Sequence, residues 1–116
     1  MSWGAVKRSK EDIKVSLLVR KKANGRCENC LRIKPLECSH FHGRRKRSVR
    51  WSLDNLSALC NYCHRNFGEN PQKHTAWMIK KLGIDRFNLL TLQANTPKKF
   101  YKGDMELLNM WLDQEL

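Results

Sequence analysis

Two CxxC pairs are the feature that most constrains how this chain of 116 residues can fold. Cys27 and Cys30 form the first pair, Cys60 and Cys63 form the second, and 29 residues lie between them. Each pair presents two thiolates from one turn, and four thiolates complete the tetrahedral shell of a structural zinc ion. Because one small domain buries only a modest core, zinc binding is expected to supply part of the folding free energy.

The alternatives to zinc are two disulfides or chance spacing of the cysteines. The expected location inside the cell argues against disulfides. No apolar run approaches the ~18 residues that span a bilayer, and residues 1–10 lack the apolar core of a signal peptide. The protein is therefore expected inside the cell, where thiols stay reduced and paired cysteines more often bind metal. Cys38 is left over and is expected to be a small buried apolar residue.

The charge balance points to a polyanionic partner. The chain has 23 Lys and Arg against 11 Asp and Glu, a net charge of +12, so nucleic acid is the first candidate. The basic surplus lies in the first half and the last 13 residues are acidic, so we expect the phosphate-facing surface in the first half and the tail turned away. The alternative is that the basic runs are ordinary solvated faces. No membrane association is expected.

The pattern of apolar and capping residues predicts one α+β domain that is mainly helical. Ser9 and Asp12 form a capping box before the first helix, and Asn70, Asp85 and Asp104 are candidate caps of later helices. A short strand is predicted through Leu36–Phe41, and a second extended piece over Val49–Leu53. The predicted divisions of domain 1–116 are a basic helix at 9–25, a zinc-bracketed core at 26–68, a helical extension at 70–95 and an acidic helix at 104–115.

The gap between the cysteine pairs is longer than the ~15 to 20 residues of a plain zinc ribbon. The motifs LECSH at 36–40, LDNL at 53–56 and LCNYCH at 59–64 resemble the HNH nuclease family. A narrower resemblance to the phage NinG, or Rap, recombination nucleases extends over roughly residues 12–93. It rests on DIKVSLLVRKKANGRCENC at 12–30, SHF at 39–41, RW at 50–51, FGEN at 67–70 and KKLGIDRF at 80–87.

The HNH resemblance implies a ββα-metal hairpin-and-helix core, pinned by the zinc site and flanked by helices. It also implies metal-dependent hydrolysis of DNA phosphodiester bonds. His40 would be the general base, Asn55 would fix the other ring nitrogen of His40, and His64 would hold a catalytic Mg²⁺ or Mn²⁺ ion. The NinG resemblance implies branched or distorted DNA as substrate, a role in recombination, and a phage or bacterial host cytoplasm as the setting.

One departure from the family pattern concerns the second ligand of the catalytic ion. Many members carry Asp or His directly before the base, and here that position is Ser39, a weak ligand for a hard cation. His42, two residues beyond His40, is expected on the same strand face and could replace it or contact phosphate. His74, alone on a predicted helix, is expected to be a structural residue with a satisfied hydrogen bond.

Eight basic residues are expected to contact DNA phosphates, positioning the substrate without reading its sequence. They are Arg44, Arg45, Lys46, Arg47 and Arg50 after the proposed base, and Arg20, Lys21 and Lys22 at the end of the first helix. Trp51 and Trp77 are expected to pack in the core. Two rival functions stay open: a non-catalytic zinc protein that binds nucleic acid, and a protein-interaction module that uses the C-terminal helix. The apolar stripe of that helix could equally be the interface of a homodimer.

Overall fold

A computed structural model describes residues 6–116, so the first five residues of the predicted domain 1–116 lie outside the described part. The described chain forms five helices and a two-stranded antiparallel sheet, which confirms the predicted α+β class. The helices are α1 (Lys10–Ala23), α2 (Asn61–Glu69), α3 (Pro71–Leu82), α4 (Ile84–Ala94) and α5 (Lys102–Glu115). No helix within residues 6–116 has the length and apolar character needed to cross a membrane.

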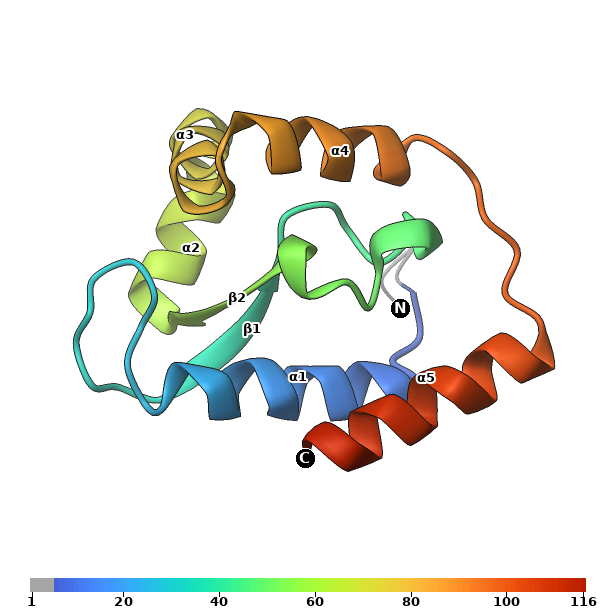
Figure 1. Cartoon of the computed structure of the whole chain (residues 1–116). Helices are drawn as coiled ribbons and strands as arrows, with labels where there is room; N and C mark the ends of the chain where they lie inside the picture. Colours follow the sequence, from blue (N-terminus) through green and yellow to red (C-terminus); the bar gives the residue numbers. More distant parts are fainter. Residues whose placement is uncertain (1–5) are drawn as a thin grey trace.

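The sheet pairs β1 (Leu36–His40) with β2 (Leu56–Cys60), and α2 follows β2 without a connecting loop. Figure 1 shows the sheet in the middle of the molecule, with α1 and α5 on one side and α3 and α4 on the other. Side chains alternate along each strand, so Ala58 on β2 packs against Val15 and Leu18 of α1, while Leu59 packs beside Phe67 of α2. The two faces of one small sheet therefore belong to two different apolar clusters.

The first helix begins as its sequence predicts. The Ser9 side chain accepts a hydrogen bond from the Asp12 backbone amide, and the Asp12 carboxylate accepts from the Ser9 amide at 2.7 Å. The helix ends where Asn24 and Gly25 adopt positive φ angles of 53° and 81°. This reversal carries the chain directly into the first cysteine pair.

The second strand lies later in the chain than predicted. Residues Val49–Leu53, predicted to be extended, instead contribute to two 3₁₀ turns at Arg47–Val49 and Leu53–Asn55, and the strand is Leu56–Cys60. All five residues of this strand are buried, so they show no alternation of apolar and polar side chains. The alternating Val49, Trp51 and Leu53 resembled a strand because their side chains are apolar at every second position.

Three predicted helix caps act differently from expectation. The Asn70 side chain donates to the carbonyl of Asn66 in α2 and does not cap α3. Gly83, with φ of 82°, precedes α4, so Asp85 lies within the first turn of that helix. Asp104 lies in the first turn of α5, where its carboxylate accepts a hydrogen bond from the Tyr101 amide at 2.9 Å. The predicted helices exist, and α3 begins at Pro71 after Asn70 as predicted, whereas α4 and α5 begin earlier than their predicted caps.

A buried ion pair joins the start of α1 to the turn before β2. The Asp12 carboxylate accepts hydrogen bonds from Arg50 Nε at 3.0 Å and from Trp51 Nε1 at 3.1 Å. Burial raises the pKa of Asp12, but hydrogen bonds from Arg50 and Ser9 outweigh it and lower the pKa to about 2. The ionised carboxylate therefore holds the loop after β1 against α1.

We expect Asp12→Asn to lower the free energy of unfolding by about 3 kcal/mol, because it leaves the buried Arg50 guanidinium without its anion. The matched control is Asp113→Asn, which breaks an exposed pair with Lys14 and is expected to cost less than about 1 kcal/mol. Urea unfolding of both variants at pH 7 measures the difference. Equal losses in the two variants would show that the Asp12 pair is no more important than a surface pair.

Candidate metal centre and histidine cleft

The four paired cysteines form one cluster at the junction of three segments. The turn after α1 supplies Cys27 and Cys30, the end of β2 supplies Cys60, and the first turn of α2 supplies Cys63. All four sulfur atoms lie within 4.8 Å of one another, and Cys30 Sγ lies 3.9 Å from Cys60 Sγ. Tetrahedral zinc with sulfur ligands at about 2.3 Å places its sulfurs about 3.8 Å apart, so the cluster can hold a zinc ion.

The thiols of the cluster differ in acidity from one another, because burial raises the pKa of Cys63 to about 12 while the pKa of Cys27 is lowered. Burial raises the pKa of Cys27, but hydrogen bonds from the backbone amides of Cys60, Cys30 and Asn29 outweigh it and lower the pKa to about 7. Burial raises the pKa of Cys38 to about 11, in keeping with its predicted role as a small apolar residue packed beside α1. A thiolate is thus favoured at Cys27 and disfavoured at Cys38.

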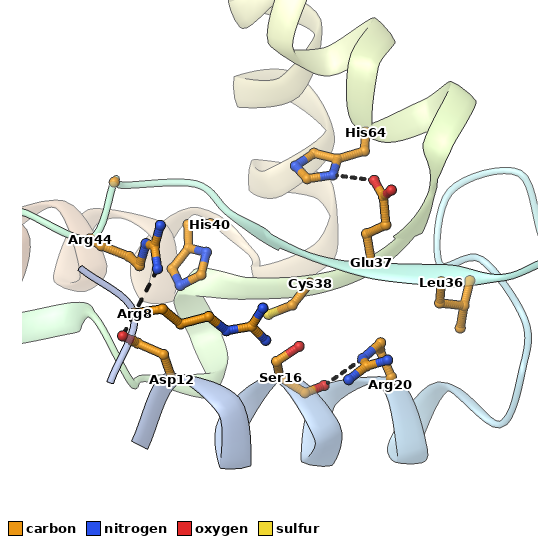
Figure 2. A pocket seen from close by; sticks show the side chains of 11 residues that line it. Arg8, Asp12, Ser16, Arg20, Leu36, Glu37, Cys38, His40, Arg44 and His64 are labelled. Atoms are coloured by element: carbon orange, nitrogen blue, oxygen red, sulfur yellow. Dashed lines mark hydrogen bonds and ion pairs between the residues drawn. The ribbon is translucent and has the colours of Figure 1, made fainter. Parts of the chain in front are cut away.

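A cleft of about 580 Å³ lies beside the cluster, between α1, β1 and α2. Figure 2 shows His40 and His64 at its rim, with Arg8 and Arg44 close to His40. The two histidines that the sequence singled out therefore line one shared cavity. The other lining residues are Asp12, Ser16, Arg20, Leu36, Glu37, Cys38 and Gly43.

His40 lies at the end of β1 with a half-buried ring. Burial lowers its pKa, and the nearby guanidinium of Arg44 lowers it further, whereas the carboxylate of Asp12 acts in the opposite direction. Its Nε2 atom is buried and has no hydrogen-bond partner. A histidine with a lowered pKa is neutral at pH 7, so this ring is able to accept a proton.

His64 is oriented by a carboxylate that the sequence analysis did not select. Its Nδ1 atom lies 2.8 Å from Glu37 Oε1, and Figure 2 shows the two side chains pointing toward each other from α2 and β1. Because a carboxylate only accepts, Nδ1–H is the donor and the lone pair is left on Nε2. Hydrogen bonds from His64 and Asn61 lower the pKa of Glu37, which keeps this carboxylate ionised.

Asn55 serves the backbone and not the His40 ring, so its predicted contact is wrong. It is fully buried (0% exposed), accepts a hydrogen bond from the His42 amide at 2.7 Å and donates to the His42 carbonyl at 2.9 Å. Both ends of the amide are occupied by residue 42. Asn55 thus fixes the chain as it leaves β1, two residues after His40.

Neither of the two tentative metal ligands lines the cleft. Ser39 is 2% exposed and pairs with Ser57 across the sheet, and Ser57 Oγ lies 3.9 Å from Met78 Sδ of α3. The strand alternation therefore turns Ser39 toward α3 and away from the cleft. His42 lies beyond the end of β1, where its ring contacts Phe41 edge-on, so it does not share the strand face of His40.

The expected DNA contacts are divided between several surfaces. Arg44 and Arg20 line the cleft, while Lys22 lies in a separate hollow beside Glu28 and Lys81. The side chain of Lys21 donates a hydrogen bond to the backbone oxygen of Leu116, which follows α5. Arg50 was wrongly assigned to this group, because it is 8% exposed and donates hydrogen bonds to the Asp12 carboxylate and the Lys7 carbonyl.

The remaining aromatic and histidine predictions concern packing. Trp51 is buried in the core between α1 and β2, and its indole N–H donates a hydrogen bond to the Asp12 carboxylate. Trp77 is half-buried against Phe67. His74 is stacked on Phe67 with ring centroids 4.7 Å apart and lies edge-on to Phe41 at 5.0 Å. The structure therefore places His74 in an aromatic cluster outside the cleft.

Two carboxylates in the cleft were missed as site residues. Glu37 stands two residues before Ser39, a spacing that puts both on one face of a strand, and this was the signal available. Asp12 was recognised only as a helix cap, because nothing local in the sequence indicates that Arg50, 38 residues away, returns to it.

These features define a four-cysteine cluster that can hold a metal ion, next to a basic cleft that contains two histidines and two carboxylates. No protein-family model, curated protein or solved structure matches the chain.

We expect the purified protein to contain one zinc ion per chain and Cys60→Ser to lose it, because three thiolates leave the shell incomplete. Loss of the ion should also remove folding free energy and lower the melting temperature. Cys38→Ser is the matched control and should keep the full zinc content. Elemental analysis and thermal unfolding measure both effects, and equal zinc loss in the two variants would exclude the four-cysteine assignment.

Proposed function

We propose that the protein is a metal-dependent endonuclease that hydrolyses phosphodiester bonds in DNA and prefers branched or otherwise distorted substrates. The observation that carries this proposal is the shared cleft, where a neutral imidazole and a carboxylate-oriented imidazole lie among arginines. The resemblance to HNH nucleases in LECSH, LDNL and LCNYCH supports the same reaction. The antiparallel β1 and β2 followed directly by α2 agree with the order of elements in that family.

In this proposal His40 is the general base. Hydrolysis needs a water molecule that loses a proton as it attacks phosphorus, and a neutral imidazole can take that proton. The lowered pKa keeps His40 deprotonated at pH 7. Asn55 acts as a positioning residue, because it fixes the backbone at residue 42 and thereby the exit of the chain from β1.

The catalytic ion is assigned to His64, with Glu37 in support. A carboxylate that accepts Nδ1–H from a ligating histidine fixes its tautomer and increases the basicity of the other nitrogen. An imidazole beside a carboxylate suits Mn²⁺, and Mg²⁺ when most of its ligands are waters. The bound ion would neutralise charge that develops on the phosphate and the leaving oxygen. Glu37 thus supplies the carboxylate that Ser39 cannot.

DNA would be held by the arginines of the cleft. Arg8, Arg20 and Arg44 line it, and the side chain of Arg44 is 34% exposed, so its guanidinium can reach a phosphate. The strongly basic chain adds a general attraction for a polyanion. The alternative function is zinc-dependent binding of nucleic acid without cutting, in which the two histidines have no chemical role.

We expect His40→Ala to lose cutting by about 10²- to 10⁴-fold, the usual contribution of a general base. Supercoiled plasmid and a four-way junction, each incubated with Mg²⁺ or Mn²⁺, measure the rate. The control variant is Ser39→Ala, which changes the neighbouring residue on the opposite strand face and should cut at the wild-type rate. Zinc content and DNA affinity should be unchanged in both variants.

Two results would contradict this assignment. Binding without cutting by the wild-type protein on either substrate would support the non-catalytic alternative. Cutting at the wild-type rate by His40→Ala would leave the nuclease in place and remove His40 as its base.

We expect Glu37→Gln to raise the Mn²⁺ concentration needed for half-maximal cutting by about 10- to 100-fold, because His64 loses its ionised partner. Excess Mn²⁺ should restore most of the rate. Glu69→Gln, which removes an exposed carboxylate from the last turn of α2, is the matched control. If the Mn²⁺ midpoint of Glu37→Gln equals that of the control, Glu37 has no part in holding the ion.

A further inference from the structure

Three hollows follow one another along the loop after β1. The cleft shares Gly43 and Arg44 with a hollow of about 380 Å³, which in turn shares Arg45 and Lys46 with a third hollow of about 290 Å³. The third hollow is bounded by the loop at 45–48 and by the segment at 94–98, which joins α4 to α5. The three hollows therefore adjoin one another along the loop between the cleft of His40 and the hollow of Lys98.

The third hollow is lined by basic side chains with no carboxylate among its lining residues. Four of them carry positive charge: Arg45, Lys46, Arg47 and Lys98. Within residues 6–116, the ion pairs within 4.0 Å involve none of Lys46, Arg47 and Lys98. Like charges that line one hollow repel one another, and a bound anion would reduce that repulsion.

Local contacts hold this hollow in shape. Ser48 Oγ donates to the Gln93 carbonyl, and Lys46 Nζ lies 3.4 Å from Asn95 Oδ1, so the loop is attached to the end of α4. Arg47 and Lys98 both lie over the ring of Phe100, at 5.6 and 4.9 Å from its centroid. Phe100 in turn meets the buried Trp51 edge-on at 5.2 Å. The cations are thus positioned by an aromatic ring that is fixed to the core.

We propose that this third hollow is a second phosphate-binding site, which takes a backbone phosphate of the DNA segment that leaves the cleft. Ammonium and guanidinium groups bind phosphate oxygens without reading bases, so the site would position the duplex and not select its sequence. The succession of adjoining hollows from the cleft to this site favours a linear polyanion over an isolated anion. The identity of the ligand as DNA rests on the proposed function, whereas the anion site itself does not.

The experiment measures binding of a 20-base-pair duplex to full-length, zinc-loaded protein by fluorescence anisotropy from 50 to 200 mM salt. His40→Ala is used as the background so that cutting does not interfere. We expect Lys98→Ala to reduce the slope of log Kd against log salt by about 1, as for the loss of one phosphate contact. Lys34→Ala removes the same charge from an exposed residue in the loop before β1 and should leave the slope unchanged. Figure 1 shows this loop on the opposite side of the molecule from the segment that joins α4 to α5.

A scan of single methylphosphonate substitutions along the duplex then locates the contact. We expect one neutralised phosphate to weaken binding to the protein that retains Lys98 and to have no further effect on Lys98→Ala. No such coupling, or equal slopes for Lys98→Ala and Lys34→Ala, would overturn the second site while leaving the nuclease proposal in place. Coupling in a protein that never cuts DNA would support the second site and contradict only the proposed reaction.

Discussion

The arrangement of the cleft depends on the closure of the four-cysteine cluster. This cluster ties the turn after α1 to the end of β2 and the start of α2, and a backbone hydrogen bond from the Glu28 amide to the Ala58 carbonyl joins the same turn to β2. Asn29 extends the junction by donating to Cys63 Sγ at 3.3 Å. Because His64 directly follows Cys63, a bound ion at the cluster also determines where the imidazole of His64 lies relative to β1.

A second junction, built on Asp12, determines the other side of the cleft. The same carboxylate caps α1, pairs with Arg50, accepts from the Trp51 indole and lies 4.0 Å from Arg44. It therefore fixes the far end of the loop that carries the basic residues, while Asn55 fixes its beginning at His42. A loop held at both ends can present cations at defined positions, which a free loop of the same composition could not do.

Local patterns in the sequence were sufficient for the helices, the first strand and the cysteine cluster. Their signals lie within a few residues: the capping box at Ser9, the Asn70 that precedes α3 and the CxxC spacing. The second strand was misplaced because burial of both its faces removes the alternation that identifies a strand. The roles of Arg50 and Glu37 depend on partners 38 and 27 residues away, and no local pattern encodes such pairs.

The smallness of the sheet explains how residues from opposite faces of β1 reach one cavity. His40 and Cys38 point toward α1, whereas Glu37 points toward α2, yet all three line the same cleft. Within residues 6–116 β1 pairs with no strand other than β2, and we infer that the cleft passes around its unpaired edge. A third strand at that edge would separate the His40 side from the Glu37 and His64 side. The unpaired edge, which is a liability in most sheets, is here the feature that brings the two imidazoles into one site.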